Sequence, residues 1–375
     1  MKVLTIFGTR PEAIKMSPLV IELEKVELIT SKLCVTGQHR EMLDQVLELF
    51  NLVPDYDLDI MKSGQSLSEI TSRIVAKLQP IISDFEPDLI LVHGDTSTAF
   101  CSALTGFYNQ VQVGHVEAGL RTGNIYSPWP EEANRKLVSC ISNYHFAPTI
   151  EAKGNLLAEG VNESDIIVTG NTVIDALLLV QSMITTDDKL TEKLRIHFPM
   201  LDYERRMILI TGHRRENFGD GLKRICESIQ ILADKYQDVD FIYPVHLNPK
   251  VREPVNEFLS SNSNIYLIEP QGYIEFVYLM IKSHLILTDS GGIQEEAPAL
   301  GKPVLVMRDT TERPEAVTAG TVKLVGTDVE KIIESVEILL LDDEEYSRMS
   351  QAHNPYGDGT AVKRIIDTIL RVITE

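Results

Sequence analysis

Three carboxylates stand at positions where a parallel α/β sheet would gather polar side chains. Asp95 follows the apolar run 89–92, Glu117 follows the run 111–115, and Glu131 opens a predicted helix. Any one of them can be a helix cap or a turn residue. Carboxylates that converge on one rim are harder to explain as caps, because environments that separate their pKa values provide an acid and a base. The set therefore indicates proton-transfer chemistry.

The stretch TDSGGIQEEAPALGKP, residues 288–303, has the pattern of an anion site. An apolar run ends in small residues at 290–292, and a helical pattern follows. Backbone N–H groups and the positive end of a helix dipole then point at one place, and glycines let a ligand approach closely. Glu296, one turn into the helix, can accept hydrogen bonds from both ribose hydroxyls. A nucleotide site is favoured over a merely capped helix, and Arg313 in the following TERPE segment adds a cation.

Two further segments place cationic or titratable groups after a strand. FGTRPEAIK sets Arg10 and Lys15 on either side of the first turn of a predicted helix. The start of a helix carries partial positive charge and favours anions, so two cations at this place suggest that an anionic ligand lies between them. The alternative is an ordinary turn whose cations are solvated. TGHRRENFGDGL places His213 at a strand end, where it is either a donor to a diphosphate or a solvated histidine.

The elements that must position these residues follow a βαβα pattern. Most apolar runs are continuous rather than alternating, as in strands that are buried on both faces of a parallel sheet. Helical patterns separate them, which predicts a doubly wound α/β fold with ligands beyond the carboxyl ends of the strands. The runs are 3–7, 33–36, 89–92, 111–115, 166–169, 207–211, 241–245, 265–268, 285–288, 304–307 and 322–325.

Eleven such runs suit two sheets better than one, so we expect two Rossmann-like domains. The first spans 1–170 and the second 171–359. The stretch 182–206 is polar and is expected to be irregular. The last helical pattern, 360–375, fits either domain on its residues alone.

Composition narrows the function. The chain of 375 residues carries 35 Lys and Arg against 55 Asp and Glu, a formal net charge of −20, which argues against binding to nucleic acid or anionic membranes. The four cysteines form no CxxC pair, and no signal peptide or apolar run of membrane-spanning length is evident. We therefore expect a cytoplasmic protein. The sequence contains no GxGxxG, HExxH or GxSxG motif. It therefore gives no argument for bound NAD, a metal or acyl hydrolysis.

Taken together, these motifs resemble the non-hydrolysing UDP-N-acetylglucosamine 2-epimerases of bacteria. The resemblance runs nearly end to end and is carried by FGTRPEAIKMSP, TGQHREMLDQV, VHGDTSTAF, VGHVEAGLRTGNIYSPWPEEANR, TGNTVIDAL, TGHRRENFG, YPVHLNP, LTDSGGIQEEAPALGKPVLVMRDTTERPEAVTAGT and NPYGDG.

The resemblance implies two Rossmann-like domains facing across a cleft, the GT-B arrangement, with the 360–375 helix crossing back to the first domain. It implies a homodimer that needs no NAD and no metal. The implied reaction interconverts UDP-N-acetylglucosamine and UDP-N-acetylmannosamine, by elimination of UDP to 2-acetamidoglucal and re-addition. Its product would supply N-acetylmannosamine units for cell-surface polysaccharide.

The resemblance also implies roles for single residues. Asp95, Glu117 and Glu131 would be the acid/base carboxylates around the sugar, with Asp95 our first choice for removing the C2 proton, and His213 would assist at the diphosphate. The substrate-binding set would be Arg10, Lys15, Asp95, Glu117, His213, Gln271, Phe276, Ser290, Gly291, Gly292, Glu296 and Arg313.

Some bacterial members of this family bind a second UDP-N-acetylglucosamine as an activator. Gln38, His39 and Arg40 lie in the stretch that carries this role. The chain departs from the pattern at Glu41 and Gly64, where some members show Gln and Arg.

Three alternatives stay open at this point. A GT-B glycosyltransferase would share the fold and the UDP-sugar pocket but needs an acceptor groove and a single base. A hydrolysing epimerase would release UDP, and typically brings a kinase-like domain. A non-catalytic UDP-sugar sensor would keep the pocket without needing Asp95, Glu117 and Glu131.

Overall fold

The computed structural model describes residues 1–37, 40–62 and 64–374. Contacts divide the chain into two compact units. Unit 1 comprises Met1–Ala176 with Tyr356–Glu375, and unit 2 comprises Leu177–Pro355. The division falls inside helix α7 (Thr172–Thr186), a few residues from the domain boundary expected at 170. The assignment of two functional domains stays a prediction.

Unit 1 is built on a parallel sheet with the strand order β3-β2-β1-β4-β5-β6-β7 among the described residues. The register pairs Lys2 with Thr30 on one side of β1 and Val3 with Leu89 on the other. The order therefore reverses between β1 and β4, which is where ligands bind in doubly wound sheets. The strands are β1 (Lys2–Phe7), β2 (Thr30–Val35), β3 (Tyr56–Asp57), β4 (Leu89–His93), β5 (Gln112–Val116), β6 (Tyr144–Ala147) and β7 (Ile166–Val168).

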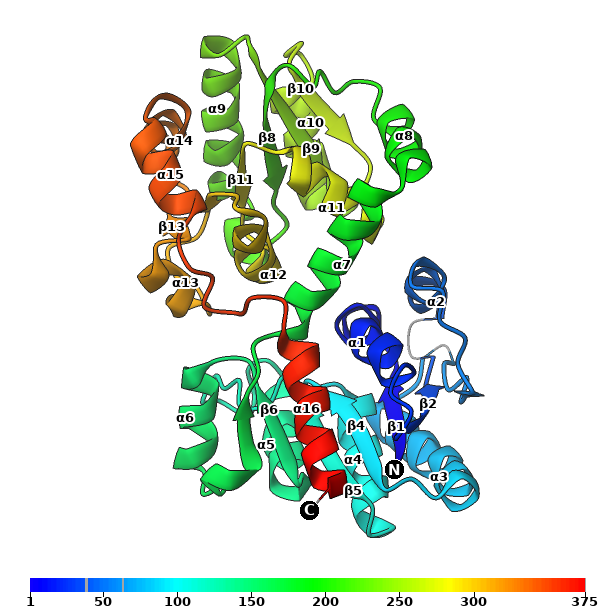
Figure 1. The fold of residues 1–375 in the computed structure, drawn as a ribbon. Helices are drawn as coiled ribbons and strands as arrows, with labels where there is room; N and C mark the ends of the chain where they lie inside the picture. Colours follow the sequence, from blue (N-terminus) through cyan, green and yellow to red (C-terminus); the bar gives the residue numbers. More distant parts are fainter. Residues whose placement is uncertain (38–39, 63, 375) are drawn as a thin grey trace. The chain divides into compact units, whose positions relative to one another are not determined.

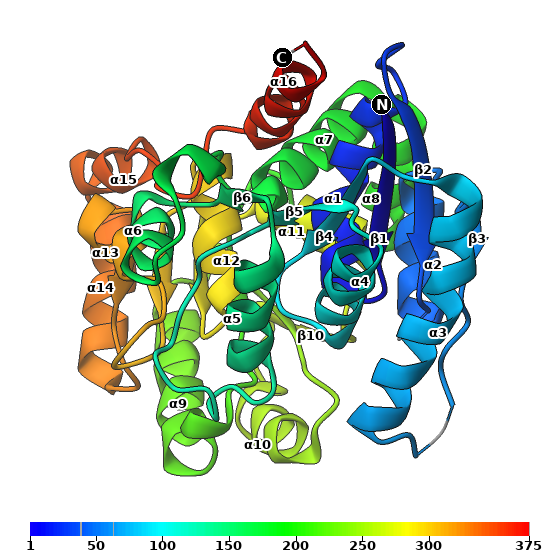
Figure 2. The same cartoon turned by 90° about the horizontal axis from the view of Figure 1, so that it is seen from below.

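Two groups of helices cover this sheet. Helix α1 packs on α2 and α16, whereas α4 packs between α3 and α5 (Figures 1 and 2). Leu4, Ile6, Ile90 and Val92 from the sheet and Ile74 from α3 are fully buried in one core. The helices are α1 (Arg10–Leu23), α2 (Arg40–Leu49), α3 (Leu67–Phe85), α4 (Ser97–Tyr108), α5 (Glu131–Ile141), α6 (Ile150–Ala158), the 3-10 turn η1 (Glu163–Asp165) and α16 (Ala361–Thr374).

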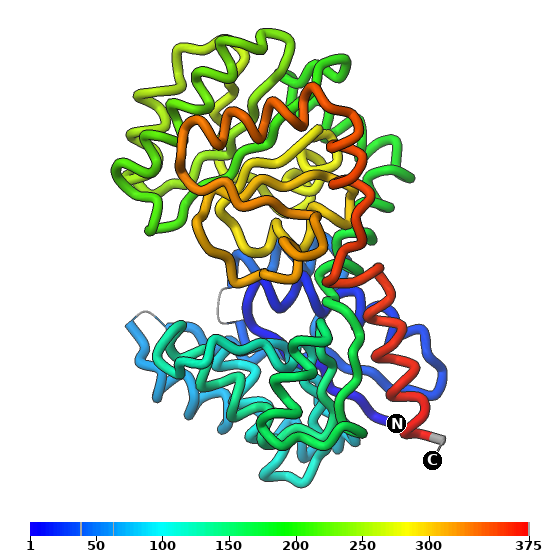
Figure 3. The backbone as a smooth tube through the Cα atoms, turned by 90° about the vertical axis from the view of Figure 1, so that its left-hand side faces the viewer, coloured from blue at the N-terminus to red at the C-terminus, as the bar shows by residue number. Residues whose placement is uncertain are grey.

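Helix α16 belongs to unit 1, so both chain ends lie in this unit (Figure 3). Its first N–H groups are capped from α7: Ala361 and Val362 donate to the two carboxylate oxygens of Asp175, at 3.3 and 3.0 Å. Burial raises the pKa of Asp175 to about 6, against the lowering effect of these hydrogen bonds.

Unit 2 has a second parallel sheet, with the order β10-β9-β8-β11-β12-β13 in the described part of the chain. Its order reverses between β8 and β11, where Thr211 stands opposite Thr288. The strands are β8 (Arg206–Thr211), β9 (Val239–Pro244), β10 (Ile265–Ile268), β11 (Leu285–Thr288), β12 (Val304–Val306) and β13 (Val322–Leu324).

The helices of unit 2 again form groups that pack among themselves. Helix α9 contacts α10 and α14, and the turn η3 contacts α11 and α12. The elements are α8 (Asp188–His197), η2 (Arg215–Asn217), α9 (Asp220–Lys235), α10 (Pro249–Leu259), α11 (Tyr273–Lys282), α12 (Gly291–Glu296), η3 (Ala297–Leu300), α13 (Pro314–Ala319), α14 (Val329–Leu341) and α15 (Asp343–Ser350).

The prediction of two doubly wound, Rossmann-like units is confirmed, and each predicted run overlaps a strand. One prediction was wrong. The stretch 182–206 is not irregular, because the end of α7 and the whole of α8 lie within it. Asp187 caps α8 by accepting from Lys189 and Leu190, so a polar composition concealed a short capped helix.

Candidate active site

The reversal point of the unit 1 sheet carries two of the motifs named above. Gly8 directly follows β1, and Gly94 and Asp95 follow β4. A side chain at position 8 would place its Cβ 1.9 Å from Thr36 Oγ1 and 2.6 Å from Thr98 Oγ1. Only glycine therefore lets the chain turn here. The two segments meet at the edge where a doubly wound sheet binds its ligand.

The start of α1 is capped by the protein's own carboxylate. Glu12 is buried, and its Oε2 accepts from the N–H groups of Gly8 and Thr9 at 3.0 and 2.8 Å. Its Oε1 accepts from Thr96 Oγ1, the cap of α4, at 2.5 Å. Burial nevertheless raises the pKa of Glu12. Because Glu12 occupies these donors, an anion at this helix start would depend on the side chain of Arg10, for which the described residues show no ion pair.

Glu117 is the centre of a polar cluster in unit 1. It follows β5 with a positive φ of 63°, an unusual conformation that turns the side chain out of the strand direction. Its Oε2 forms an ion pair with Lys15 Nζ and accepts from Asn171 Nδ2 at 2.9 Å. His93 Nε2 lies 3.8 Å away, and burial lowers the pKa of His93 to about 4, so this imidazole is neutral. Lys15, predicted to bind diphosphate, thus faces a carboxylate.

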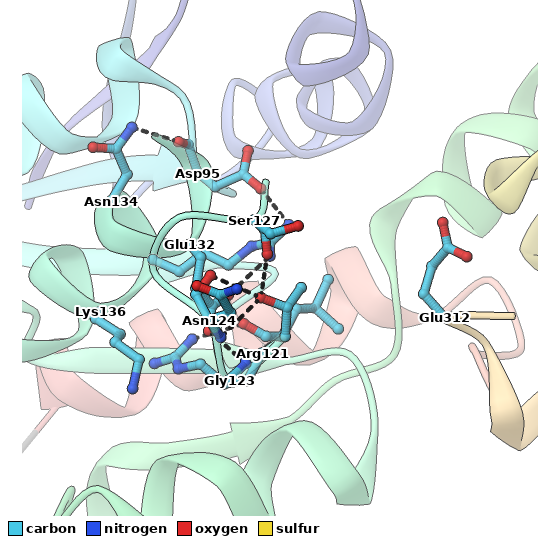
Figure 4. Close-up of polar contacts among 12 residues, drawn as sticks. Asp95, Arg121, Gly123, Asn124, Ser127, Glu132, Asn134, Lys136 and Glu312 are labelled. Atoms are coloured by element: carbon cyan, nitrogen blue, oxygen red, sulfur yellow. Dashed lines mark hydrogen bonds and ion pairs between the residues drawn. The ribbon is translucent and has the colours of Figure 1, made fainter. Parts of the chain in front are cut away.

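Asp95 is held from helix α5 (Figure 4). Its Oδ2 forms an ion pair with Arg135 Nη2 at 2.6 Å, and its backbone oxygen accepts from Asn134 Nδ2 at 2.8 Å. Burial raises the pKa of Asp95, Arg135 acts against this, and the nearby charge of Glu117 adds to it. The charge of Glu117 therefore acts on the ionisation of Asp95.

Glu131 is the first residue of α5, as the sequence indicated. Its Oε2 atom is buried and makes no hydrogen bond within the described part of the chain. A buried carboxylate oxygen without a hydrogen bond costs free energy unless a water molecule, an ion or a ligand satisfies it. This is what a cap would not show, so the observation favours a functional role for Glu131.

The reversal point of the unit 2 sheet is organised by Asp289, which directly follows β11 and is 1% exposed. Its carboxylate accepts from the backbone N–H groups of His213 and Arg214 and from Asn217 Nδ2, at 2.9, 2.9 and 3.2 Å from Oδ2. Asn217 also donates to the backbone oxygen of Met307, at 3.1 Å. The loop after β8 is therefore fixed to the ends of β11 and β12.

The side chain of His213 is partly exposed at this loop. It stacks on His246, with ring centroids 5.4 Å apart, and its Nδ1 lies 3.6 Å from Asp289 Oδ1. Burial lowers the pKa of His213, while Asp289 acts in the opposite direction. A neutral imidazole next to open space can donate one N–H to an anionic ligand.

Helix α12 starts at the predicted glycines, with Ser290 as the residue before it. A Cβ added at Gly291 or Gly292 would have its nearest neighbours at 3.6 and 3.7 Å, so a methyl group would fit here in ordinary van der Waals contact. Glu296 ends α12, one turn from its start.

The cation expected beside α12, Arg313, is neutralised within unit 2, and so is the nearby Arg308. Arg313 is paired with Glu295, which is 3% exposed. Arg308 is paired with Glu216 and Glu312. A bound anion would have to compete with these carboxylates, which sequence reasoning did not foresee.

The last predicted ligand residues of unit 2 lie near α11. Gln271 precedes this helix; its Oε1 lies 3.0 Å from His197 Nε2, and its Nε2 donates to Glu269 O at 2.6 Å. Phe276 is partly buried in the first turns of α11.

Of the predicted activator residues, Gln38 and His39 lie outside the described residues. Arg40 starts α2 and forms ion pairs with Asp57 at 2.6 Å and Asp44 at 3.5 Å.

Sequence reasoning missed several residues that organise these places. Arg135 was quoted only as the end of a motif, although Glu132 and Arg135 have the three-residue spacing of a helical ion pair. Asp289 was seen as a strand end but given no role. Asn171 gave no signal beyond its motif, because its partner Glu117 is distant in the chain. Thr9 and Glu12 have the spacing of a capping box, a signal that could have indicated the role of Glu12 at the start of α1.

Comparison with known proteins decides the family. The model of the UDP-N-acetylglucosamine 2-epimerase family matches residues 21–370. The chain belongs to this family. It is 60% identical to the UDP-N-acetylglucosamine 2-epimerase of Escherichia coli K12 over 369 residues, which is 98% of each chain. The resemblance carried by the motifs is thereby confirmed.

Solved structures agree. The UDP-GlcNAc 2-epimerase of Neisseria meningitidis, bound to UDP-GlcNAc, has a TM-score of 0.88 at 58% identity and covers 99% of this chain and 100% of its own. MnaA of S. aureus, solved with UDP, has a TM-score of 0.84 at 47% identity, covering 100% and 98%. The Neisseria meningitidis epimerase has the GT-B type of fold, which supports the predicted fold class.

Two absences concern only the described residues. They include no group of three or more His, Cys, Asp or Glu side chains arranged to hold a metal ion. Among their helices, none combines the length and apolar character needed to cross a membrane.

Proposed function

We propose that this chain interconverts UDP-N-acetylglucosamine and UDP-N-acetylmannosamine by inverting C2 of the sugar. Family membership over nearly the whole chain supports the reaction. The observation that carries the chemistry is a pair of carboxylates that follow the neighbouring strands β4 and β5. Asp95 is paired with Arg135, Glu117 is paired with Lys15, and the charge of Glu117 acts on Asp95.

Inversion at C2 needs a proton removed from carbon and returned to the other face. That proton is barely acidic unless the C1–O bond to UDP breaks as it leaves. The C–H electron pair then forms the C1=C2 double bond of 2-acetamidoglucal, and the C1–O pair departs with UDP. Re-addition of UDP to C1 with protonation of the opposite face of C2 completes the inversion. The protein must supply an acid, a base and donors for the leaving diphosphate.

The environments of the two carboxylates differ in the way that acid/base chemistry requires. Lys15 and Asn171 stabilise the ionised form of Glu117. Burial favours the protonated form of Asp95, although Arg135 limits this effect. We assign the C2 proton transfers to this pair. These environments suit Glu117 as the base that removes the proton and Asp95 as the acid, whereas Asp95 was our first choice for the base from the sequence. Glu131, with its buried unpaired oxygen, is the third carboxylate of the set.

We assign UDP binding to the His213 loop and the start of α12, and Arg10 stays a predicted ligand of the diphosphate. Ser290, Gly291 and Gly292 would lie against the diphosphate, Glu296 would bind ribose, and Gln271 and Phe276 would line the uridine pocket. The room beside the glycines and the fixed position of the His213 loop support this assignment. Arg313 would have to exchange Glu295 for the diphosphate, or act through that carboxylate.

Several further expectations stay predictions. They are a homodimer, a cytoplasmic location, the activator role of Gln38, His39 and Arg40, and the supply of N-acetylmannosamine units for surface polysaccharide. The reaction as written requires no NAD and no metal.

The proposal is tested by incubating the purified protein with UDP-N-acetylglucosamine, with no acceptor and no NAD, and identifying products by NMR. We expect UDP-N-acetylmannosamine and no accumulation of free UDP. Release of UDP with free N-acetylmannosamine would instead identify a hydrolysing epimerase. An unchanged spectrum in the presence of confirmed binding would favour a transferase or a sensor.

A further inference from the structure

We propose that Arg135 is a positioning residue for Asp95, held in place by Glu132, and that it sets both the direction and the charge state of this carboxyl group. The inference rests on the proposed function, because it concerns a residue that acts through Asp95 in that reaction.

Arg135 forms a fork between two carboxylates, those of Asp95 and Glu132, both of which are labelled in Figure 4. Arg135 Nη2 lies 2.6 Å from Asp95 Oδ2, and Nη1 lies 3.1 Å from Glu132 Oε2. The side chain of Glu132 is fully buried, and that of Arg135 is 17% exposed. A planar guanidinium presents its donors in fixed directions, so a pair of bonds from one group also fixes the orientation of each partner.

The same helix also fixes the backbone of Asp95. Asn134, next to Arg135 in α5, donates to the backbone oxygen of Asp95 at 2.8 Å. Asp95 lies in the short segment between Gly94, whose φ is +65°, and Thr96, the cap of α4. Both the main chain and the carboxylate of Asp95 are therefore placed by one turn of α5.

Glu132 connects this fork to the loop that precedes α5. Its Oε1 accepts from the backbone N–H of Gly123 at 3.1 Å, while Oε2 faces Arg135. Gly123 has a φ of +79°, so the loop makes a tight turn at this contact. A single buried carboxylate thus holds the loop with one oxygen and the arginine with the other. The group has no solvent to replace either partner.

The charge balance around Asp95 predicts the effect of each substitution. The charged groups that face it are Arg135, Glu117 and Lys15. Burial raises the pKa of Asp95, and Arg135 opposes this rise. Without the arginine charge, burial and the charge of Glu117 should raise the pKa of Asp95 further. Removing the charge of Glu132 leaves more of the arginine charge acting on Asp95.

The test compares Arg135→Gln, Arg135→Lys and Glu132→Gln by kcat and by the pH profile of kcat/KM. Arg135→Gln should lower kcat about 100-fold and move the limb of the profile that depends on Asp95 to higher pH by about one to three units. Arg135→Lys should leave that limb close to its original pH, since the charge is kept. It should still lower kcat, since an ammonium lacks the planar fork that fixes the direction of each carboxylate. Glu132→Gln should move the limb to lower pH.

Lys136→Met is the matched control. Lys136 follows Arg135 on α5 and also makes an ion pair, at 2.8 Å, but with Glu159 rather than Asp95. The Lys136→Met variant should have the same kcat and the same pH profile of kcat/KM as the unaltered protein. The carboxyl pKa of Asp95, followed by carbon NMR in labelled protein with Asp95→Asn for assignment, should show the same opposite shifts without reference to activity.

Opposite shifts for Arg135→Gln and Glu132→Gln support the inference, because general loss of structure would not reverse sign. If Arg135→Gln does not fold, Arg135→Lys still tests the expected loss of kcat. Glu132→Gln still tests the expected shift of the pH profile. If the Arg135→Gln protein has the same kcat and the same pH profile as Lys136→Met, the inference about Arg135 is wrong, whereas the proposed function still stands. An unaltered protein that does not epimerise overturns the proposed function, and the NMR shifts then decide the Arg135 relationship separately.

Discussion

The backbone N–H of His213 donates to both carboxylate oxygens of Asp289, at 3.1 and 2.9 Å. Asp289 is buried at the end of β11, and the loop after β8 is anchored on it. One carboxylate thereby sets the position of the histidine that is proposed to meet the diphosphate. We therefore expect Asp289 to affect UDP binding through the His213 loop, without contacting the ligand.

Asp289→Asn should therefore weaken UDP binding. An asparagine keeps one acceptor oxygen but turns an N–H₂ group toward the donors of the loop, and hydrogen bonds to a charged group contribute about 1.5–3 kcal/mol each. We expect UDP affinity to fall at least about tenfold by calorimetry.

Asp240→Asn is the control for this prediction. Asp240 is equally buried in unit 2, but it lies at the other end of its strand and pairs with Arg205 at 3.0 Å. Both variants should have a lower Tm, and only Asp289→Asn should lose UDP affinity. Equal affinities in the two variants would show that the loop does not need this anchor.

Asp95→Asn should separate binding from chemistry. The amide has the shape of the carboxylate but can neither accept nor return a proton, so kcat/KM should fall by about 100- to 10,000-fold. Affinity for UDP, which lacks the sugar, should change little. Loss of UDP binding in step with turnover would identify Asp95 as a structural carboxylate instead.

Arg10→Met and Lys15→Met should have different kinetic effects. Arg10 has no ion pair among the described residues, whereas Lys15 is paired with Glu117. Arg10→Met should chiefly raise KM and the Kd for UDP, because it removes a cation for the diphosphate. Lys15→Met should chiefly lower kcat, because Glu117 loses the charge that keeps it ionised. If both variants raise KM to the same extent, Lys15 binds the diphosphate as the sequence predicted.

UDP binding should strengthen as the pH falls toward the pKa of His213. Burial lowers this pKa below its ordinary value of 6.5 in the free protein, and a neighbouring diphosphate should raise it. The extra affinity is then complete below the pKa of the free protein and is lost as the pH rises through the higher pKa of the complex. Calorimetry in two buffers of different ionisation enthalpy should detect proton uptake. His213→Gln should abolish the uptake, and a pH dependence unchanged in that variant would contradict this assignment.

The sheets were predictable because buried parallel strands leave a local signal. Runs such as 89–92 and 285–288 are continuous and apolar, and each overlaps a strand that ends at a predicted site. Strand β6 (Tyr144–Ala147) was not expected, since it is short and its His145 interrupts the apolar pattern even though it is buried. Helix α8 was missed because only a few apolar residues, Leu194 among them, mark its buried side.

The ion pairs of the site could not be predicted in the same way. Lys15 and Glu117 are 102 residues apart, and both were expected to meet the substrate rather than each other. The pairing of Arg313 with Glu295 likewise depends on how β12 and its following loop return beside α12. A spacing in sequence shows which residues reach one edge of a sheet. It does not show which carboxylate neutralises which cation there.

The most direct test of the account is the fate of the C2 proton. The protein is incubated with UDP-N-acetylglucosamine in D2O without NAD or acceptor, and the reaction is followed by proton NMR. We predict a UDP-N-acetylmannosamine signal together with loss of the C2 proton signal in both sugars, since each passage through the intermediate returns a deuteron. UDP-N-acetylmannosamine that retains its original proton at C2, or a substrate that binds and stays unchanged, would contradict proton transfer at the carboxylates of unit 1.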